Sequence, residues 1–168
     1  MRELSLNVMD IVQNSVRAGA SLITVQVAES KKHDTLTITI TDNGCGMSAE
    51  QVKSVIDPFF TTRTTRKVGL GVPLFKMEAE MTGGSFQIDS EEGKGTKVTA
   101  VFRPSHVDMI PLGDIASVIH LLITCNPELD FLFTHSVEEK RDHPRYPYAA
   151  RAAGGRSVYG ARGIGVDS

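Results

Sequence analysis

The sequence of 168 residues is poor in cysteine and in long apolar runs, and each shortage excludes a class of protein. Its two cysteines, Cys45 and Cys125, are too few for a disulfide framework or a cysteine-rich zinc site. No apolar run approaches the roughly 20 residues that span a bilayer. The N-terminus also lacks the basic segment and apolar run of a signal peptide. We therefore expect a cytoplasmic protein with no membrane partner.

An excess of positive charge is also missing, because the formal net charge is −2. Such a chain has no general attraction to nucleic acid, which we do not expect as a partner. The charge is uneven, since residues 1–139 sum to −6 and residues 140–168 to +4. The second stretch is rich in glycine and arginine and has no core-forming periodicity, a composition that favours disorder. We expect a disordered basic tail there, and a shifted reading frame after about residue 140 is a further hypothesis.

Hydrophobic periodicity predicts alternating helices and strands before that tail. Helical spacing predicts helices over residues 3–18, 48–56, 69–81 and 115–123. Alternation of apolar and polar residues predicts strands over residues 22–28, 35–41, 85–90, 96–102 and 129–134. The first four strands form two hairpins. This order predicts an α+β fold, a two-layer α/β sandwich with helices on one face of a mostly antiparallel sheet.

A glycine-rich turn, Asp42–Met47, directly follows one of these strands. A carboxylate at a strand end accepts hydrogen bonds and suits an exocyclic amino group such as that of adenine. Gly44 and Gly46 allow the backbone to pass close to a flat ligand. The same three residues, Asp-Asn-Gly, are also typical of an ordinary tight turn, so both interpretations stay open on this motif alone.

A second glycine turn, Gly69-Leu70-Gly71, opens a predicted helix, whose N-terminal backbone N–H groups favour phosphate. It lacks the third glycine of a dinucleotide fingerprint and the lysine of a P-loop. The loop before it is dense in hydroxyls and cations: Thr61, Thr62, Arg63, Thr64, Thr65, Arg66 and Lys67.

On the first predicted helix, Asp10 and Asn14 lie four residues apart and share a face. Asp10 can order a water or accept a proton, and Asn14 offers Mg²⁺ a carbonyl oxygen. An isolated pair of this kind is also typical of a solvated polar stripe.

Taken in order, these motifs resemble the N, G1, F, G2 and G3 boxes of the GHKL ATPase superfamily of gyrase, heat-shock chaperones, histidine kinases and mismatch-repair proteins. The matching residues are Asp10 with Asn14, Asp42-x-Gly44-x-Gly46, Pro58–Thr62, Gly69–Gly71, and Gly83-Gly84 with Gly93–Thr96. They lie within residues 1–103, about 60% of the chain. In style the chain is similar to small stand-alone bacterial histidine-kinase-like ATP-binding proteins.

The resemblance implies a Bergerat-type ATP-binding fold with ATP and Mg²⁺ as cofactors. It implies that Asn14 binds magnesium, that Asp42 contacts the adenine amino group and that Thr96 reaches the adenine-side water network. The remaining implied ATP-binding residues are Gly44, Gly46 and Met47 around the base, Gly69, Leu70, Gly71 and Val72 at the phosphate turn, and Thr61, Thr62, Arg63, Arg66 and Lys67 in the lid. The implied division is an ATP-binding domain over residues 1–104, a small αβ extension over 105–139 and the tail over 140–168.

The sequence departs from the family at Asp10, where hydrolysing members usually carry glutamate. A carboxylate one methylene shorter predicts slow hydrolysis, because a misplacement of about 1 Å costs on the order of 100-fold in rate. The lid is short, and no helical hairpin with a phosphoacceptor histidine precedes the first helix, so we do not expect a complete sensor kinase. Three functions follow: an ATPase or phosphotransferase module, a serine protein kinase of anti-sigma-factor type that acts on a partner protein, or a non-catalytic ATP-dependent adaptor.

Overall fold

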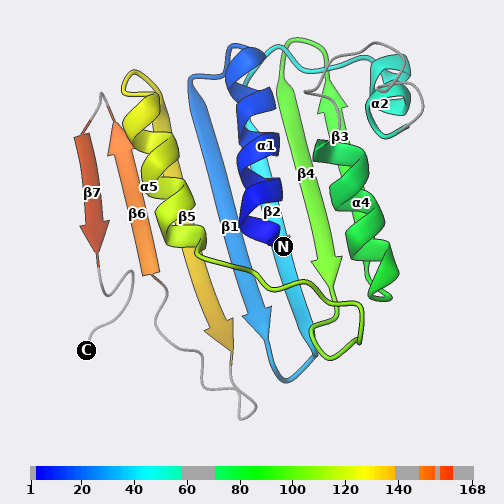
Figure 1. The fold of residues 1–168 in the computed structure, drawn as a ribbon. Helices are drawn as coiled ribbons and strands as arrows, with labels where there is room; N and C mark the ends of the chain where they lie inside the picture. Colours follow the sequence, from blue (N-terminus) through cyan, green and yellow to red (C-terminus); the bar gives the residue numbers. More distant parts are fainter. Residues whose placement is uncertain (1–2, 58–70, 139–147, 154–155, 161–168) are drawn as a thin grey trace.

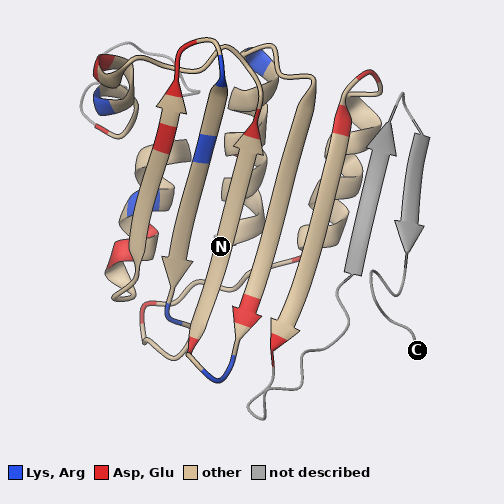
Figure 2. Ribbon diagram, turned by 180° about the vertical axis from the view of Figure 1, so that it is seen from behind, with Lys and Arg blue, Asp and Glu red and all other residues tan. Residues whose placement is uncertain are grey.

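A layer of helices covers one face of a seven-stranded sheet in the order β3-β4-β2-β1-β5-β6-β7 (Figure 1). The computed structural model describes residues 3–57, 71–138, 148–153 and 156–160, the last two as backbone. Seen from behind, the other sheet face has no helix of this described part over it, and most charges lie toward the strand ends (Figure 2). The predicted two-layer α+β sandwich is confirmed.

The predicted elements of residues 3–134 occur close to their expected bounds. The helices are α1 (Leu4–Arg17), α2 (Ala49–Val55), α4 (Gly71–Met81) and α5 (Ile115–Cys125). The strands are β1 (Leu22–Ser30), β2 (Thr35–Asp42), β3 (Ser85–Glu91), β4 (Gly95–Phe102), β5 (Asp130–Glu138), β6 (Tyr148–Ala153) and β7 (Arg156–Gly160). Neighbouring strands pair antiparallel except β1 and β5, which are parallel.

The hydrophobic core lies between the helices and the sheet, because alternate strand residues point to the same face. On β1 these are Ile23, Val25 and Val27, each almost completely buried. Phe75 of α4 and Phe102 of β4 pack with ring centroids 5.5 Å apart. The periodicity of the sequence therefore identified the core-facing side of α1 and of the alternating strands.

Helices α1 and α4 pack closely. A Cβ on Gly71 would lie 2.9 Å from the Cβ of Asp10, so glycine allows this approach. Closer to the start of α1 and further along α4, the buried Asn7 side-chain amide donates to the buried Glu78 carboxylate. Gly71 thus places the first turn of α4 against Asp10 of α1, and Glu78 places a later turn of α4 against Asn7.

The extension after β4 returns to the start of α1. The backbone N–H groups of Leu4 and Ser5 donate to the carbonyls of Pro111 and Leu112, at 2.9 Å each. Asp114 caps the N-terminus of helix α5. Its carboxylate accepts from the hydroxyl and the N–H of Ser117, and these bonds lower the pKa of Asp114. The extension thus stabilises the N-terminus of α1.

Regular backbone structure also occurs in residues 148–153 and 156–160, inside the expected disordered tail. Strand β6 pairs antiparallel with β5, from Phe131↔Ala152 to His135↔Tyr148, and β7 pairs with β6. The lack of apolar periodicity that suggested disorder does not prevent strand pairing, because the backbone groups of β5 provide the partners. The division of the chain at residues 104 and 139 stays a prediction.

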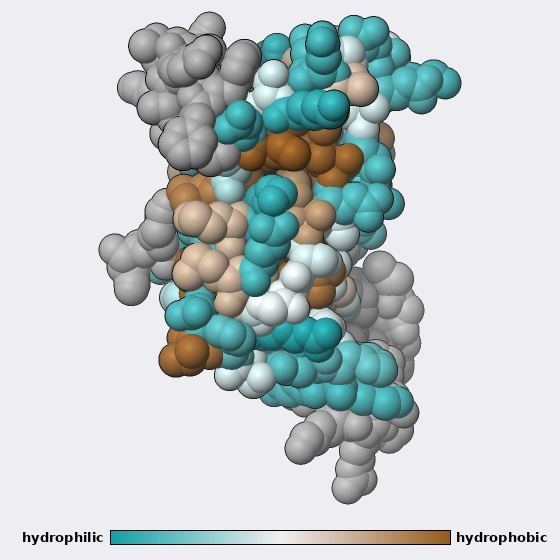
Figure 3. Space-filling model, turned by 90° about the vertical axis from the view of Figure 1, so that its right-hand side faces the viewer, coloured by the Kyte–Doolittle hydropathy of each residue, from teal (hydrophilic) through white to brown (hydrophobic). Residues whose placement is uncertain are grey.

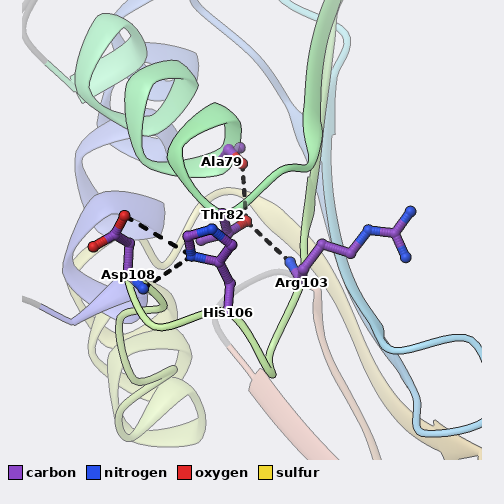
Figure 4. Close-up of polar contacts among 5 residues, drawn as sticks. All are labelled: Ala79, Thr82, Arg103, His106 and Asp108. Carbon is purple, nitrogen blue, oxygen red and sulfur yellow. Dashed lines mark hydrogen bonds and ion pairs between the residues drawn. The ribbon is translucent and has the colours of Figure 1, made fainter.

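Thr82 connects the end of α4 to the end of β4. Its hydroxyl donates to the Ala79 carbonyl (2.9 Å) and accepts from the Arg103 N–H (3.0 Å), and its side chain is buried (Figure 4). Further along the chain, His106 Nδ1 accepts from the Asp108 N–H at 3.0 Å (Figure 4). One hydroxyl therefore satisfies a donor and an acceptor at a junction between the two layers.

Replacing Thr82 by valine is expected to lower the free energy of unfolding by about 1–3 kcal/mol, because the Arg103 N–H loses its acceptor. The volume is nearly unchanged, so chemical denaturation reports the hydrogen bonds. Thr99→Val, on the uncovered face of β4, is the matched control and should change stability by less than about 0.5 kcal/mol. Equal effects of the two substitutions would contradict this role of Thr82.

Candidate functional site

A cavity of about 290 Å³ opens between α1, α2 and the sheet, at the end of the molecule where β2 ends. This is a size suited to a small-molecule ligand. The residues that line it are Ile11, Asn14, Ser15, Ala18, Ile40, Asp42, Cys45, Gly46, Met47, Gln51, Val55, Val72, Ile88, Thr96 and Val98. Predicted site residues from four separate motifs thus meet around one space.

Asp42 provides the carboxylate of this cavity from the last position of β2. Its Oδ2 accepts from the Ser15 hydroxyl of α1 at 2.6 Å, and its Oδ1 accepts from the Gly44 N–H at 2.8 Å. Ser15 is only 4% exposed. Two fixed donors therefore orient the carboxylate, whose remaining lone pairs are available to a ligand.

The turn after Asp42 approaches its neighbours too closely for side chains at its glycines. A Cβ on Gly44 would lie 2.8 Å from the Cβ of Ala18. Gly46 has a φ of +72°, and its Cβ would lie 2.0 Å from the Glu91 carbonyl oxygen. The turn is also bonded on both sides, from the Cys45 N–H to the Ala18 carbonyl and from the Gly93 N–H to the Cys45 carbonyl. These glycines are required by the fold of the site.

Thr96 lies opposite Asp42 in the register of β2 and β4. Its hydroxyl is 2.8 Å from the hydroxyl of Ser90, its neighbour on β3. Ser90 in turn accepts from the Met47 N–H at 2.8 Å. A row of polar side chains therefore runs from Ser15 of α1 through Asp42 and Thr96, which line the cavity, to Ser90 of β3 behind them.

The walls of the cavity are apolar. Ile11 of α1 and Val72 of α4 line it from the helices. Ile40 of β2, Val98 of β4 and Ile88 of β3 line it from the sheet. On the side of the molecule formed by α4 and β3, an apolar area lies in the upper half, bordered by polar residues (Figure 3). Apolar walls around one carboxylate suit a flat heterocyclic ring that carries a donor.

Asn14 lines the cavity one turn along α1 from Asp10. The Asn14 Oδ1 accepts from Arg17 at 3.2 Å. Asp10 is exposed and lies beside Gly71, the first residue of α4, rather than among the lining residues. Among the described residues, Asp42 thus lies at the cavity, whereas Asp10 lies outside it beside the first turn of α4.

The structure brings together most of the predicted residues that it describes. Asn14, Asp42, Gly46, Met47, Val72 and Thr96 line the cavity, Gly44 bonds to Asp42, and Gly71 and Asp10 lie side by side. Seven predicted residues lie outside the described residues: Thr61, Thr62, Arg63, Arg66, Lys67, Gly69 and Leu70.

Three further polar residues of the site were not predicted from the sequence. Ser15 and Ser90 orient cavity groups, and Gln51 lines the cavity. Gln51 had a signal of another kind, because Ser48 and Gln51 form the capping box that starts α2. Ser15 lies at the same helical spacing as the buried apolar residues of α1, so the sequence indicates only that it is a core position.

Residues 2–106 match the family model described as "Histidine kinase-, DNA gyrase B-, and HSP90-like ATPase". The chain belongs to this family. Membership implies that the domain binds ATP, and the cavity that Asp42 lines lies inside the matched residues.

Curated relatives of this family member include several sensor kinases. The chain is 31% identical over 91 residues to the sensor histidine kinase ZraS of Escherichia coli K12, which covers 54% of this chain and 19% of that kinase. It is 32% identical over 95 residues to the heme sensor protein HssS of Staphylococcus saprophyticus, 56% of this chain and 21% of that protein. It is 36% identical over 90 residues to the sensor protein DegM of a Bacillus strain, a match that covers 54% of this chain and 24% of that protein. The chain thus spans about a fifth of the length of these relatives.

Within the described residues, none of the helices combines the length and the apolar character needed to cross a membrane. The cytoplasmic location stays a prediction.

Proposed function

We propose that the domain binds Mg-ATP in this cavity and hydrolyses it slowly or transfers its γ-phosphate. The observation that carries the proposal is the Asp42 carboxylate, oriented by Ser15 and Gly44 at the end of an apolar cavity. A carboxylate accepts the hydrogen bond that an adenine amino group donates. The apolar walls would then cover both faces of the base.

The residues around Asn14 and Asp10 fit a magnesium ion beside phosphates. Asn14 offers a carbonyl oxygen there, and Mg²⁺ prefers oxygen ligands and keeps few protein ligands when phosphates supply others. When bound, the ion would neutralise phosphate charge. The first turn of α4 begins next to Asp10, and N–H groups at a helix N-terminus favour an anion. The predicted phosphate contacts of the lid residues belong to the same proposal.

Asp10 is proposed as the group that orders the attacking water or accepts its proton. Because aspartate is shorter than the usual glutamate, we expect wild-type turnover below about 1 s⁻¹, under typical enzyme rates. Asp10→Asn should lower turnover by about 100-fold or more while the ATP Kd stays within a factor of about three. Phosphate release and ATP titration with magnesium measure the two quantities. Turnover above 1 s⁻¹ would contradict slow hydrolysis, and unchanged turnover in Asp10→Asn would exclude Asp10 as the base.

Phosphotransfer to a partner protein is the second candidate, favoured by relatives that are named sensor histidine kinases. Incubation with labelled ATP and a cell extract should then label a discrete protein. A serine acceptor would favour a kinase of anti-sigma-factor type. Tight ATP binding with neither release nor transfer would instead favour an ATP-dependent adaptor.

A further inference from the structure

The Ser90 hydroxyl makes three polar contacts, and they determine how it uses its single hydrogen. It lies 2.8 Å from the Met47 nitrogen, 3.0 Å from the Gly95 carbonyl oxygen and 2.8 Å from the Thr96 hydroxyl. The Met47 N–H can only donate and the Gly95 carbonyl can only accept. Both backbone contacts are satisfied together only when the hydrogen of Ser90 goes to Gly95 and one lone pair of Ser90 accepts from Met47.

The remaining lone pair of Ser90 can only accept, so Thr96 donates in the contact between the two hydroxyls. This commits the one hydrogen of the Thr96 hydroxyl to Ser90. Thr96 lines the cavity and is left with lone pairs for a ligand. Its hydroxyl thus acts toward the cavity as an acceptor.

The neighbouring group on β2 is also an acceptor. Asp42 and Thr96 are direct partners in the β2–β4 register, so their side chains lie on the same face about 5 Å apart at Cβ. Ser15 and Gly44 already donate to the Asp42 carboxylate. This end of the cavity therefore presents acceptors from two adjacent strands. A ligand amino group meets partners there, whereas an oxo group meets lone pairs.

We infer that Ser90 is a positioning residue that makes the base-binding end of the cavity selective for an amino group over an oxo group. It acts through Thr96, whose hydroxyl it keeps in the accepting orientation. The inference rests on the proposed binding of ATP and adds to it the origin of base selectivity. Without Ser90, the Thr96 hydrogen is released and can turn toward a ligand oxygen.

The test compares ATP with inosine triphosphate, whose base carries an oxo group where adenine carries its amino group. Calorimetric titration with magnesium gives the ratio of the two Kd values for each variant. Ser90→Ala should lower the preference for ATP by about tenfold, through tighter inosine triphosphate binding relative to ATP. Ser90→Thr keeps the hydroxyl and should restore the preference. Ser85→Ala, the same change at an exposed position of β3, should leave it unchanged.

A double-mutant cycle of Ser90 and Thr96 distinguishes an effect through the Thr96 hydroxyl from an effect through movement of the turn at Met47. With Thr96→Val in the background, Ser90→Ala should no longer change the ratio, because no hydroxyl remains to reorient. An unchanged ratio in Ser90→Ala alone, or an equal change with valine at position 96, would overturn the inference. A wild-type protein that binds neither nucleotide would instead overturn the proposed function.

Discussion

Asp42→Asn is expected to weaken ATP binding by about 100-fold while the fold survives. The Gly44 N–H needs an acceptor, so the new amide oxygen should take the place of Oδ1. The amide NH₂ then lies on the side of Ser15 and the cavity, where it meets the ligand amino group donor to donor. Loss of a charged hydrogen bond together with this mismatch is worth about 3 kcal/mol, or about 100-fold in Kd.

Titration of ATP with magnesium measures this loss, and circular dichroism with thermal unfolding checks the fold. Asp42→Ala should bind as weakly, since it also removes the acceptor. Asp89→Asn is the matched control, because that strand carboxylate is exposed on β3 and contacts Gln87. ATP affinity near the wild-type value in either Asp42 variant would refute the assignment of Asp42 to the base.

Gly46→Ala is expected to have the second largest effect, on both stability and binding. A new Cβ would lie 2.0 Å from the Glu91 carbonyl oxygen, and the φ of +72° is itself strained for alanine. Because backbone atoms are the obstacle, the turn must move away from β3. We expect a loss of about 3 kcal/mol or more in the free energy of unfolding and strongly weakened ATP binding.

Gly93→Ala is the control that separates crowding from backbone strain. Gly93 also has a positive φ, +83°, but its Cβ would meet nothing within 4 Å. Gly93→Ala should therefore lower the free energy of unfolding only by the backbone strain, about 1–2 kcal/mol, and ATP binding should be largely kept. Denaturant titrations of the two variants side by side give the difference. Similar losses would show that the close approach of the turn to Glu91 does not matter.

Several elements were predictable because their signals are local. The capping box of Ser48 and Gln51 starts α2 where the sequence places it. Alternation of apolar residues predicts the hairpin of β1 and β2, and the turn at Gly93 predicts that of β3 and β4. In each case the signal and the structure involve residues close together in the chain.

The pairing of β5 had no such signal. Its run of residues near 129–134 is recognisable as a strand, but its parallel pairing with β1 joins residues over 100 positions apart. Both β2 and β5 pair with β1, and nothing in the alternation of β5 says which sheet edge it joins. The strands β6 and β7 depend in the same way on a partner, β5, that comes earlier in the chain.

The sequence by itself determined the order of the elements up to β5, the buried face of α1 and of the alternating strands, and the motif residues Asn14, Asp42, Gly46 and Thr96. These follow from periodicity and from the motif order that resembles the family. The tertiary structure alone decided that Ser15 and Ser90 belong to the site, since each contacts a cavity residue at a hydrogen-bond distance of 2.6 or 2.8 Å. A serine on a buried helix face or an edge strand looks the same in sequence whether its hydroxyl bonds to a backbone group or to a ligand-binding side chain. Only the register of the strands and the packing of α1 on the sheet decide which partner it has.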